Sequence, residues 1–152
     1  MENLVTGFFY RLSDLISFLK TLIKKLLEDF GDEVQDLGTD SEESCDYPDI
    51  AFPLGESVAS GNHDFGILIC SNGVGPSIAA NKVPGIRAAI CHDVFAAKRA
   101  RQHTNVNVLC LGAWSIGQGH ASEIVSSFRS AEFEGGRHER RLSKIDDFER
   151  ER

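Results

Sequence analysis

The chain has 152 residues, enough for one domain with its own hydrophobic core, and a formal net charge of −7 that argues against a general nucleic-acid or anionic-membrane surface. No segment of the sequence is long and apolar enough to span a bilayer, and we expect no signal peptide because no small-residue cleavage site is evident. The four cysteines, Cys45, Cys70, Cys91 and Cys110, lack Cys-x-x-Cys spacing, which predicts reduced thiols in a cytoplasmic protein.

The first third of the chain predicts a strand, a helix, a short strand and a second helix. Residues 3–9 are the only candidate for a first strand, and they make a poor one. Residues 12–30 carry apolar side chains at spacings of three and four, which indicates an amphipathic helix packed on a sheet. The lysines of this helix leave a membrane-surface helix as the alternative. Residues 33–37 are a short candidate strand, an acidic loop covers 38–48, and 50–60 form a second helix.

The chain is organised around one apolar run that ends in a cysteine. Residues 66–70 predict a buried parallel strand that ends at Cys70. Gly73 and Gly75 then allow a sharp turn, and Pro76 suits the first position of a small-residue helix. Backbone N–H groups at the start of this helix favour an anion above the strand, where open α/β sheets bind ligands. The alternative is a tight turn beside a buried, inert cysteine.

The remaining elements repeat the alternation of strand and helix. Strands are predicted at 86–91 and 106–111, and helices at 94–103 and 122–128, before a strongly charged end at 133–152. Such alternation with short turns indicates an α/β fold, in which helices cover both faces of a mostly parallel sheet.

Several residues could perform chemistry at the carboxyl ends of these strands. Cys70 is the candidate base or nucleophile, because a helix N-terminus helps a thiol to ionise. Asn72 and the backbone N–H groups of residues 71–75 could hold a developing oxyanion. His92 and His103 are equal candidates for a catalytic histidine from the pattern alone.

A pair of arginines near the end of the chain predicts an anion site. Arg137 and Arg141 are four residues apart and share one face if the segment is helical. Two guanidinium groups on one face could hold a phosphate bidentately. A solvated basic tail is the alternative interpretation.

Several runs, taken in order, resemble the ribose-5-phosphate isomerase B family, which is related to the galactose-6-phosphate isomerase subunits. They are Leu-Gly-Thr-Asp-Ser, Asp-Tyr-Pro-Asp-Ile-Ala, Gly-Ile-Leu-Ile-Cys, Ser-Ile-Ala-Ala-Asn-Lys, Gly-Ile-Arg-Ala-Ala-Ile-Cys-His-Asp, Asn-Val-Leu-Cys-Leu-Gly-Ala and Phe-Glu-Gly-Gly-Arg-His-Glu-Arg-Arg. The resemblance covers residues 31–150. It implies a Rossmann-like three-layer fold, isomerisation of sugar phosphates without a metal or cofactor, and a homodimer or dimer of dimers with sites between subunits.

The resemblance also implies roles for individual residues. Cys70 would move a proton between C1 and C2 of the sugar through an enediolate, and His103 would assist ring opening. Asn72 lies in the turn that would bind the enediolate oxygens. The implied substrate contacts are Asp14, Tyr47, Ser71, Gly73, Val74, Gly75, Ser77, Thr104, Arg137 and Arg141.

The chain departs from the family pattern within the implied site. Ser71-Asn72 replaces the usual Gly-Thr after the cysteine, Thr104 replaces a common asparagine, and Trp114 replaces a phosphate-side arginine of many members. Asn72 can still donate a hydrogen bond.

The largest departure is at the amino end of the chain. The family opens with a strand and Ser-Asp-His-Ala-Gly-Phe-x-Leu-Lys, whereas residues 13–20 lack the histidine and the glycine. We therefore expect one domain over residues 1–152, with a divergent segment at 1–30, a weakened or altered first strand and turnover below that of full members. The expected reaction is conversion of ribose 5-phosphate to ribulose 5-phosphate. The alternatives are a different sugar phosphate, for example a six-carbon one, and a non-catalytic sugar-phosphate-binding relative.

Overall fold

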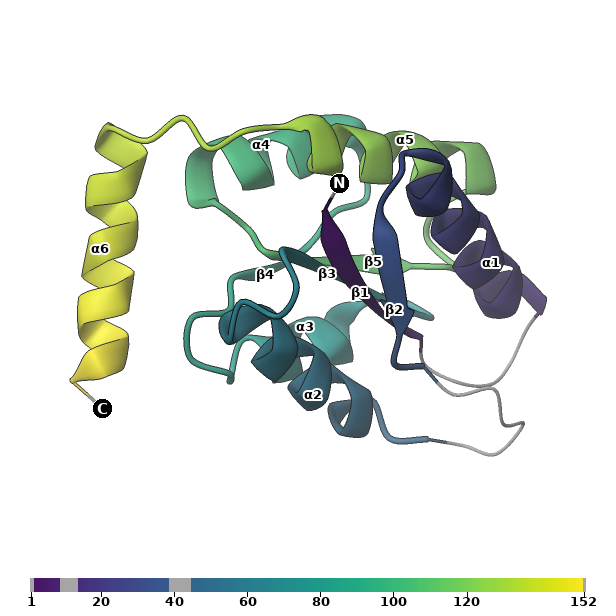
Figure 1. Ribbon diagram of the computed structural model, residues 1–152, viewed down its shortest axis with the longest axis horizontal. Coiled ribbons are helices and arrows are strands. Elements are labelled where there is room, and N and C mark those ends of the chain that lie inside the picture. Colours follow the sequence, from purple (N-terminus) through teal and green to yellow (C-terminus); the bar gives the residue numbers. More distant parts are fainter. Residues whose placement is uncertain (1, 9–13, 39–44, 152) are drawn as a thin grey trace.

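The computed structural model describes residues 2–8, 14–38 and 45–151, without the side chains of Phe8 and Asp14. Within these residues, the strands are β1 (Asn3–Phe8), β2 (Glu33–Asp36), β3 (Phe65–Cys70), β4 (Ala88–Ile90) and β5 (Val108–Gly112). The helices described there are α1 (Asp14–Asp29), α2 (Pro48–Ala59), α3 (Val74–Ala80), α4 (Val94–Thr104), α5 (Gln118–Ser130) and α6 (Arg137–Arg150). All strand pairs are parallel, and the sheet order is β2-β1-β3-β5-β4 (Figure 1).

Helices cover both faces of the sheet, which confirms the predicted α/β architecture (Figure 1). Helices α1, α4 and α5 bury apolar side chains on one face, and α2 and α3 do so on the other. The first core includes Ile23, Leu27, Ile67, Leu109, Ile124 and Phe128, and the second includes Ile50, Leu54, Leu68 and Val108. Since both faces are buried, β3 and β5 carry no charged or amide side chain along their whole length.

The expectation of a weakened first strand is wrong. β1 pairs with β2 on one side and with β3 on the other, so it lies inside the sheet. Leu4, Val5 and Thr6 are at most 1% exposed. Burial of these side chains stabilises the strand and offsets its modest strand propensity. Gly7 suits this strand because a Cβ there would lie 2.7 Å from a methyl of Ile50 and 2.8 Å from one of Leu68.

The amphipathic segment forms α1 and packs on the sheet. Its buried side chains are Ile16, Leu19, Ile23 and Leu27, spaced by three and four residues as predicted. The apolar stripe is therefore covered by the protein core, which favours packing over the membrane-surface alternative. Among the described residues, no helix has the length and apolar character needed to cross a membrane.

Several predicted boundaries differ from the structure, including those around the central turn and at β4. Helix α3 begins at Val74, with Gly73 at its N-cap in the left-handed conformation (φ 78°), so Pro76 occupies the third position. Gly73 needs this positive φ because the chain reverses directly after β3. The predicted strand at 86–91 is shorter, because pairing with β5 extends only over Ala88–Ile90.

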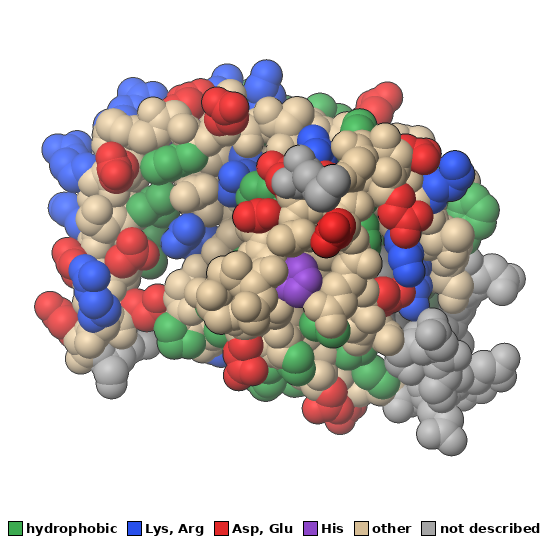
Figure 2. All heavy atoms as spheres, viewed as in Figure 1, with side chains coloured by type: hydrophobic (Ala, Val, Ile, Leu, Met, Phe, Trp, Pro, Cys, Tyr) green, Lys and Arg blue, Asp and Glu red, His purple; other side chains and the backbone are tan. Residues whose placement is uncertain are grey.

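Helix α6 lies beside α4 at one end of the molecule (Figure 1). Helix α6 also contacts the loop between α3 and β4. The Gly85 N–H donates to a Glu149 carboxylate oxygen, and Arg87 forms an ion pair with Asp146. Figure 2 shows basic side chains gathered over α6 with apolar side chains beside them. Ile145 and Phe148 of this helix are 56% and 57% exposed, so α6 presents an apolar stripe to the outside.

Candidate active site

The turn after β3 rests directly on the end of β5. Cys70, the last residue of β3, pairs with Gly112 of β5. The Ala113 N–H donates to the Cys70 carbonyl over 2.8 Å, and the Trp114 N–H donates to the Ser71 carbonyl over 3.0 Å. These bonds fix the turn at the carboxyl edge of the sheet, next to the reversal of strand order between β1 and β3 where such folds bind ligands.

Cys70 differs from the other sheet cysteines in its surroundings. Its side chain is half-buried, and its Sγ lies 3.8 Å from the Ser71 Oγ. Cys91 and Cys110 are buried, and desolvation raises the pKa of Cys91 to about 11 and that of Cys110 still further. Of the sheet thiols, Cys70 is therefore the one that a ligand at the carboxyl edge can reach.

The predicted residues in and beside the Cys70 turn make different contacts. The Asn72 Oδ1 accepts the Val74 N–H over 3.0 Å, so the oxygen of this amide is engaged within the turn, while its NH₂ group remains a donor. The Tyr47 ring covers Gly75, where a Cβ would meet ring atoms at 2.9–3.1 Å, and this places the phenol beside the turn. Ser77 is buried and hydrogen-bonds the Cys110 thiol, so its hydroxyl is directed at the sheet instead of the turn.

The close approach of Asn72 to β5 yields a testable prediction. A Cβ on Gly112 would lie 2.9 Å from the Asn72 Cα, so Gly112→Ala must push the turn away from β5. We expect this variant to lose about 1–3 kcal/mol of folding free energy. We also expect its turnover to fall because the turn carries the candidate site. Gly119→Ala is the matched control, since nothing lies within 4 Å of its Cβ position. Urea unfolding and steady-state kinetics measure both effects, and an active, undestabilised Gly112→Ala variant would contradict them.

A second group of predicted residues lies at the opposite edge of the sheet. His103 and Thr104 end α4, just before β5 begins, and Arg137 and Arg141 lie in the first turns of α6. Arg137 and Arg141 are both exposed, as an anion site requires. The Thr104 Oγ1 donates to the Ala100 carbonyl over 2.7 Å, so in this structure its hydroxyl proton caps the helix.

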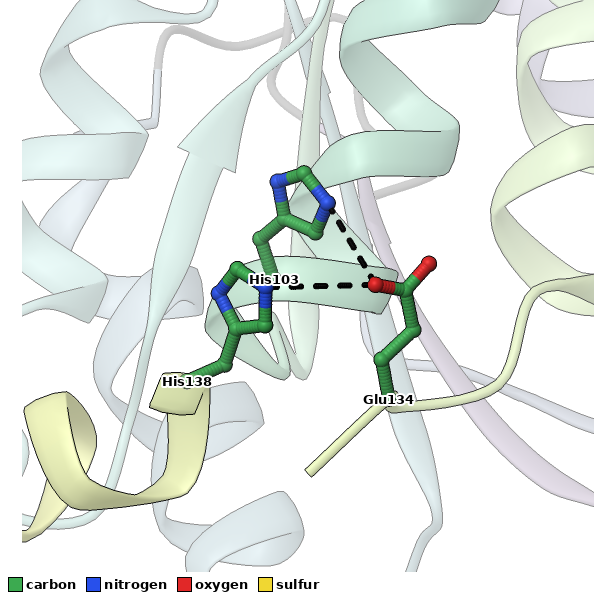
Figure 3. Close-up of side chains that lie close together, drawn as sticks. All are labelled: His103, Glu134 and His138. Carbon is green, nitrogen blue, oxygen red and sulfur yellow. Dashed lines mark ion pairs between the residues drawn. The ribbon is translucent and has the colours of Figure 1, made fainter. Parts of the chain in front are cut away.

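The His103 ring stacks on the ring of His138, with centroids 4.2 Å apart and an interplanar angle of 7°. Glu134 lies at the edge of both rings (Figure 3). Its Oε2 is 3.6 Å from the His103 Nε2 and 3.8 Å from the His138 Nε2. Desolvation, reinforced by His103, Arg137 and Arg141, lowers the pKa of His138 below 6.5 despite the opposing effect of Glu134. Burial and the neighbouring cations therefore disfavour the charged form of the His138 ring.

The Glu134, His103 and His138 ligand atoms all lie within 4.8 Å of one another, a spacing that could suit a metal ion. The Arg137 Nε donates to the His138 Nε2 over 3.4 Å, and the Arg99 Nη1 lies 3.3 Å from the His103 Nε2. Guanidinium groups therefore face the nitrogens that a metal would use. This arrangement favours a hydrogen-bonded histidine–carboxylate cluster over a metal site.

Sequence reasoning missed the partners of His103, which are Arg99, Glu134 and His138. The spacing of four between Arg99 and His103, and between Glu134 and His138, was the available signal. The contact between the two pairs depends on the path of the linker from α5 to α6, which the sequence pattern does not give. His92, the competing histidine, is exposed after β4, which lies beyond β5 from the Cys70 strand. The Asp14 side chain lies outside the described part of the structure.

Within one chain, the two groups lie at opposite edges of the sheet. Cys70 pairs with Gly112 at the carboxyl end of β5, whereas His103 precedes the amino end of the same strand. At about 3.3 Å per residue, β5 alone separates these ends by roughly 13 Å. Cys70 and His103 of one chain are therefore too far apart to contact the same carbon atoms.

The parallel sheet and the cysteine turn define an α/β protein of the class that binds ligands at the carboxyl edge. Residues 14–145 match the Ribose/Galactose Isomerase family, and the chain belongs to this family. Its sequence is 46% identical to ribose-5-phosphate isomerase B of Escherichia coli, over 88% of this chain and 90% of that one. It is 44% identical to D-erythrulose-4-phosphate isomerase of Pectobacterium atrosepticum, over 86% and 87%.

The fold is similar to solved structures of the same family. Ribose-5-phosphate isomerase B of Mycoplasma genitalium, solved with bound ribulose-5-phosphate, superimposes with a TM-score of 0.89 at 39% identity, covering 99% of this chain and 97% of that one. The chain is thus a member of a family of sugar-phosphate isomerases. The expected Rossmann-like fold and the sequence resemblance are confirmed.

Proposed function

We propose that this protein interconverts ribose 5-phosphate and ribulose 5-phosphate, with Cys70 as the group that carries the proton. The observation that carries the proposal is the half-buried Cys70 thiol, held at the carboxyl edge beside a turn fastened to β5. Family membership supports the reaction class. Relatives are named for ribose 5-phosphate and for D-erythrulose 4-phosphate, which supports a five-carbon or a four-carbon sugar phosphate as the substrate.

The chemistry requires a base for one C–H bond and donors for two oxygens. The Cys70 thiolate takes the proton from C2 of the open-chain aldose, so an S–H bond forms while the C–H electrons create the C1–C2 double bond. The O1 atom gains negative charge in this step, and the NH₂ group of Asn72 together with backbone N–H groups of the turn would stabilise it. The hydroxyl proton of O2 passes to O1, the thiol returns its proton to C1, O2 becomes the ketone oxygen, and the thiolate is restored.

We propose that the complete site forms between two copies of this chain. The Cys70 turn of one protomer would meet His103, Arg137 and Arg141 of its partner, because these groups lie at opposite edges within a chain. A second copy also accounts for the exposed apolar side chains of α4 and α6. Phe95 is 71% exposed, and Ile145 and Phe148 exceed half exposure. A two-fold axis would give two such sites per dimer.

The phosphate role assigned to α6 gives a second prediction. Removing Arg137 and Arg141 together deletes charge-assisted hydrogen bonds, so the affinity for ribose 5-phosphate should fall at least roughly tenfold per arginine. The matched control removes Arg140 and Lys144, two exposed cations of the same helix. Calorimetric titration with ribose 5-phosphate and with ribose compares the variants. Unchanged affinity in the Arg137/Arg141 double variant would show a solvated basic surface instead of a phosphate site.

The divergent amino end favours a second candidate, a sugar-phosphate-binding relative with little turnover. The family match begins at residue 14, so the segment before it lies outside the matched region. A panel of ribose 5-phosphate, a four-carbon aldose phosphate and a six-carbon aldose phosphate separates the candidates. We expect the highest kcat/KM with ribose 5-phosphate. Binding of all three without ketose formation would favour the non-catalytic relative, and a higher kcat/KM with another sugar would reassign the substrate.

A further inference from the structure

Glu134 lies where one carboxylate can act on two histidines. It belongs to the linker between α5 and α6, and its own N–H donates to the Gln102 carbonyl of α4 over 3.0 Å. This bond fixes the linker on the last turn of α4, next to His103. Gly135 and Gly136 follow with φ values of 63° and 58°, conformations that suit glycine and bring α6 back over α4. The fold therefore holds Glu134 at the edge of the stacked rings (Figure 3).

The two charged neighbours of His103 favour opposite states of its ring. The Arg99 Nη1 lies 3.3 Å from the His103 Nε2, and an arginine only donates, so this contact requires Nε2 to accept and the proton to be on Nδ1. The Glu134 Oε2 lies 3.6 Å from the same nitrogen and only accepts, so it favours a proton on Nε2. Arg99 is itself held by Glu134, with 3.7 Å between Nη1 and Oε1.

The His138 ring packs against the face of the His103 ring. His138 is 6% exposed, and desolvation together with the surrounding cations lowers its pKa and so disfavours its charged form. A neutral ring stacked at 4.2 Å limits rotation of the His103 ring without adding a competing positive charge. Arg137 and Arg141 face the cluster from α6, so Glu134 carries the negative charge that opposes three guanidinium groups.

We propose that Glu134 is a positioning residue for His103, which sets the nitrogen that carries the proton and so prepares the ring for its part in opening the sugar. The inference rests on the proposed function, because His103 is assigned to ring opening there. Glu134 itself would not touch the reacting atoms. Partners of this kind change activity by about 10–100-fold when they are removed from histidines that bind metals, and we expect a comparable effect here.

The test separates ring opening from proton transfer in the variant Glu134→Gln. Ribose 5-phosphate is largely a closed ring, whereas ribulose 5-phosphate has no free hydroxyl that could close a five-membered ring and binds in the open form. We expect kcat/KM on ribose 5-phosphate to fall about 10–100-fold, with KM changed little. Exchange of the C1 protons of ribulose 5-phosphate in D₂O should stay within about twofold of the unmodified protein, because it needs only the Cys70 turn. Glu132→Gln is the matched control, an exposed carboxylate two residues away.

A spectroscopic measurement supplies the second readout. In ¹⁵N NMR of the full chain, Glu134→Gln should shift the His103 tautomer towards protonated Nδ1, since Arg99 remains while the acceptor charge is lost. An unchanged tautomer, or equal losses in isomerisation and in C1 exchange, would overturn the proposal. Absence of both activities in the unmodified protein would instead refute the proposed function, and the tautomer measurement would still decide the role of Glu134.

Discussion

Cys70→Ala is expected to remove nearly all isomerase activity while leaving the fold and phosphate binding intact. A positioned general base contributes about 10²–10⁴-fold to a proton transfer, so kcat should fall by that range. Affinity for ribose 5-phosphate should change little, because the proposed phosphate ligands are on α6. Stability should also change little, because the Cys70 side chain is half-buried at the end of its strand.

The control for this variant is the loss of a thiol elsewhere in the sheet. Cys91→Ala removes a buried thiol whose pKa is raised to about 11, so it cannot serve as a base near neutral pH. Circular dichroism and steady-state kinetics of both variants with ribose 5-phosphate complete the comparison. An active Cys70→Ala variant would refute the assignment and redirect attention to His92 and His103.

The second large effect is expected when two inactive variants share a dimer. Cys70→Ala and His103→Ala should each abolish turnover of ring-closed ribose 5-phosphate as homodimers. In a heterodimer purified through two different tags, one site would combine the intact Cys70 of one protomer with the intact His103 of its partner. The other site would lack both groups. Two-fold symmetry then predicts about half of the unmodified activity in the heterodimer.

The heterodimer distinguishes shared sites from sites within one chain. If Cys70 and His103 of the same chain worked together, every site in the heterodimer would contain one defect, and no activity would return. A dimer in which both chains carry Cys70→Ala and differ only in their tags controls for effects of the tags. A monomer by light scattering at assay concentrations would also contradict the shared site.

The sequence predicted the Cys70 turn well because its determinants are local. An apolar run, two glycines and a small-residue helix occur in succession, and each acts within a few residues. Even here, the hydrogen bond from the Val74 N–H to Asn72 and the burial of Ser77 against Cys110 depend on side-chain geometry that the pattern does not contain. The position of the turn at the end of β3 therefore followed from the motif, while the hydrogen-bond partners of its side chains required coordinates.

The first strand and the histidine cluster were predicted less well for a shared reason. β1 appears poor by propensity, yet it is stabilised by pairing with two distant strands and by burial on both faces. In the same way, Glu134 meets His103 only because the linker returns to α4 through a bond to Gln102. Interactions between distant parts of the chain decide both features, and no local pattern reports them.

We expect this chain to move a proton between C1 and C2 of a sugar phosphate. The most direct test of this activity is ¹H and ¹³C NMR of ribose 5-phosphate incubated with the protein in D₂O. We expect ribulose 5-phosphate with solvent deuterium at C1, because the Cys70 proton exchanges with solvent while the enediolate exists. Ribose 5-phosphate that remains unconverted, at concentrations where its binding is measurable, would contradict the proposed isomerase activity.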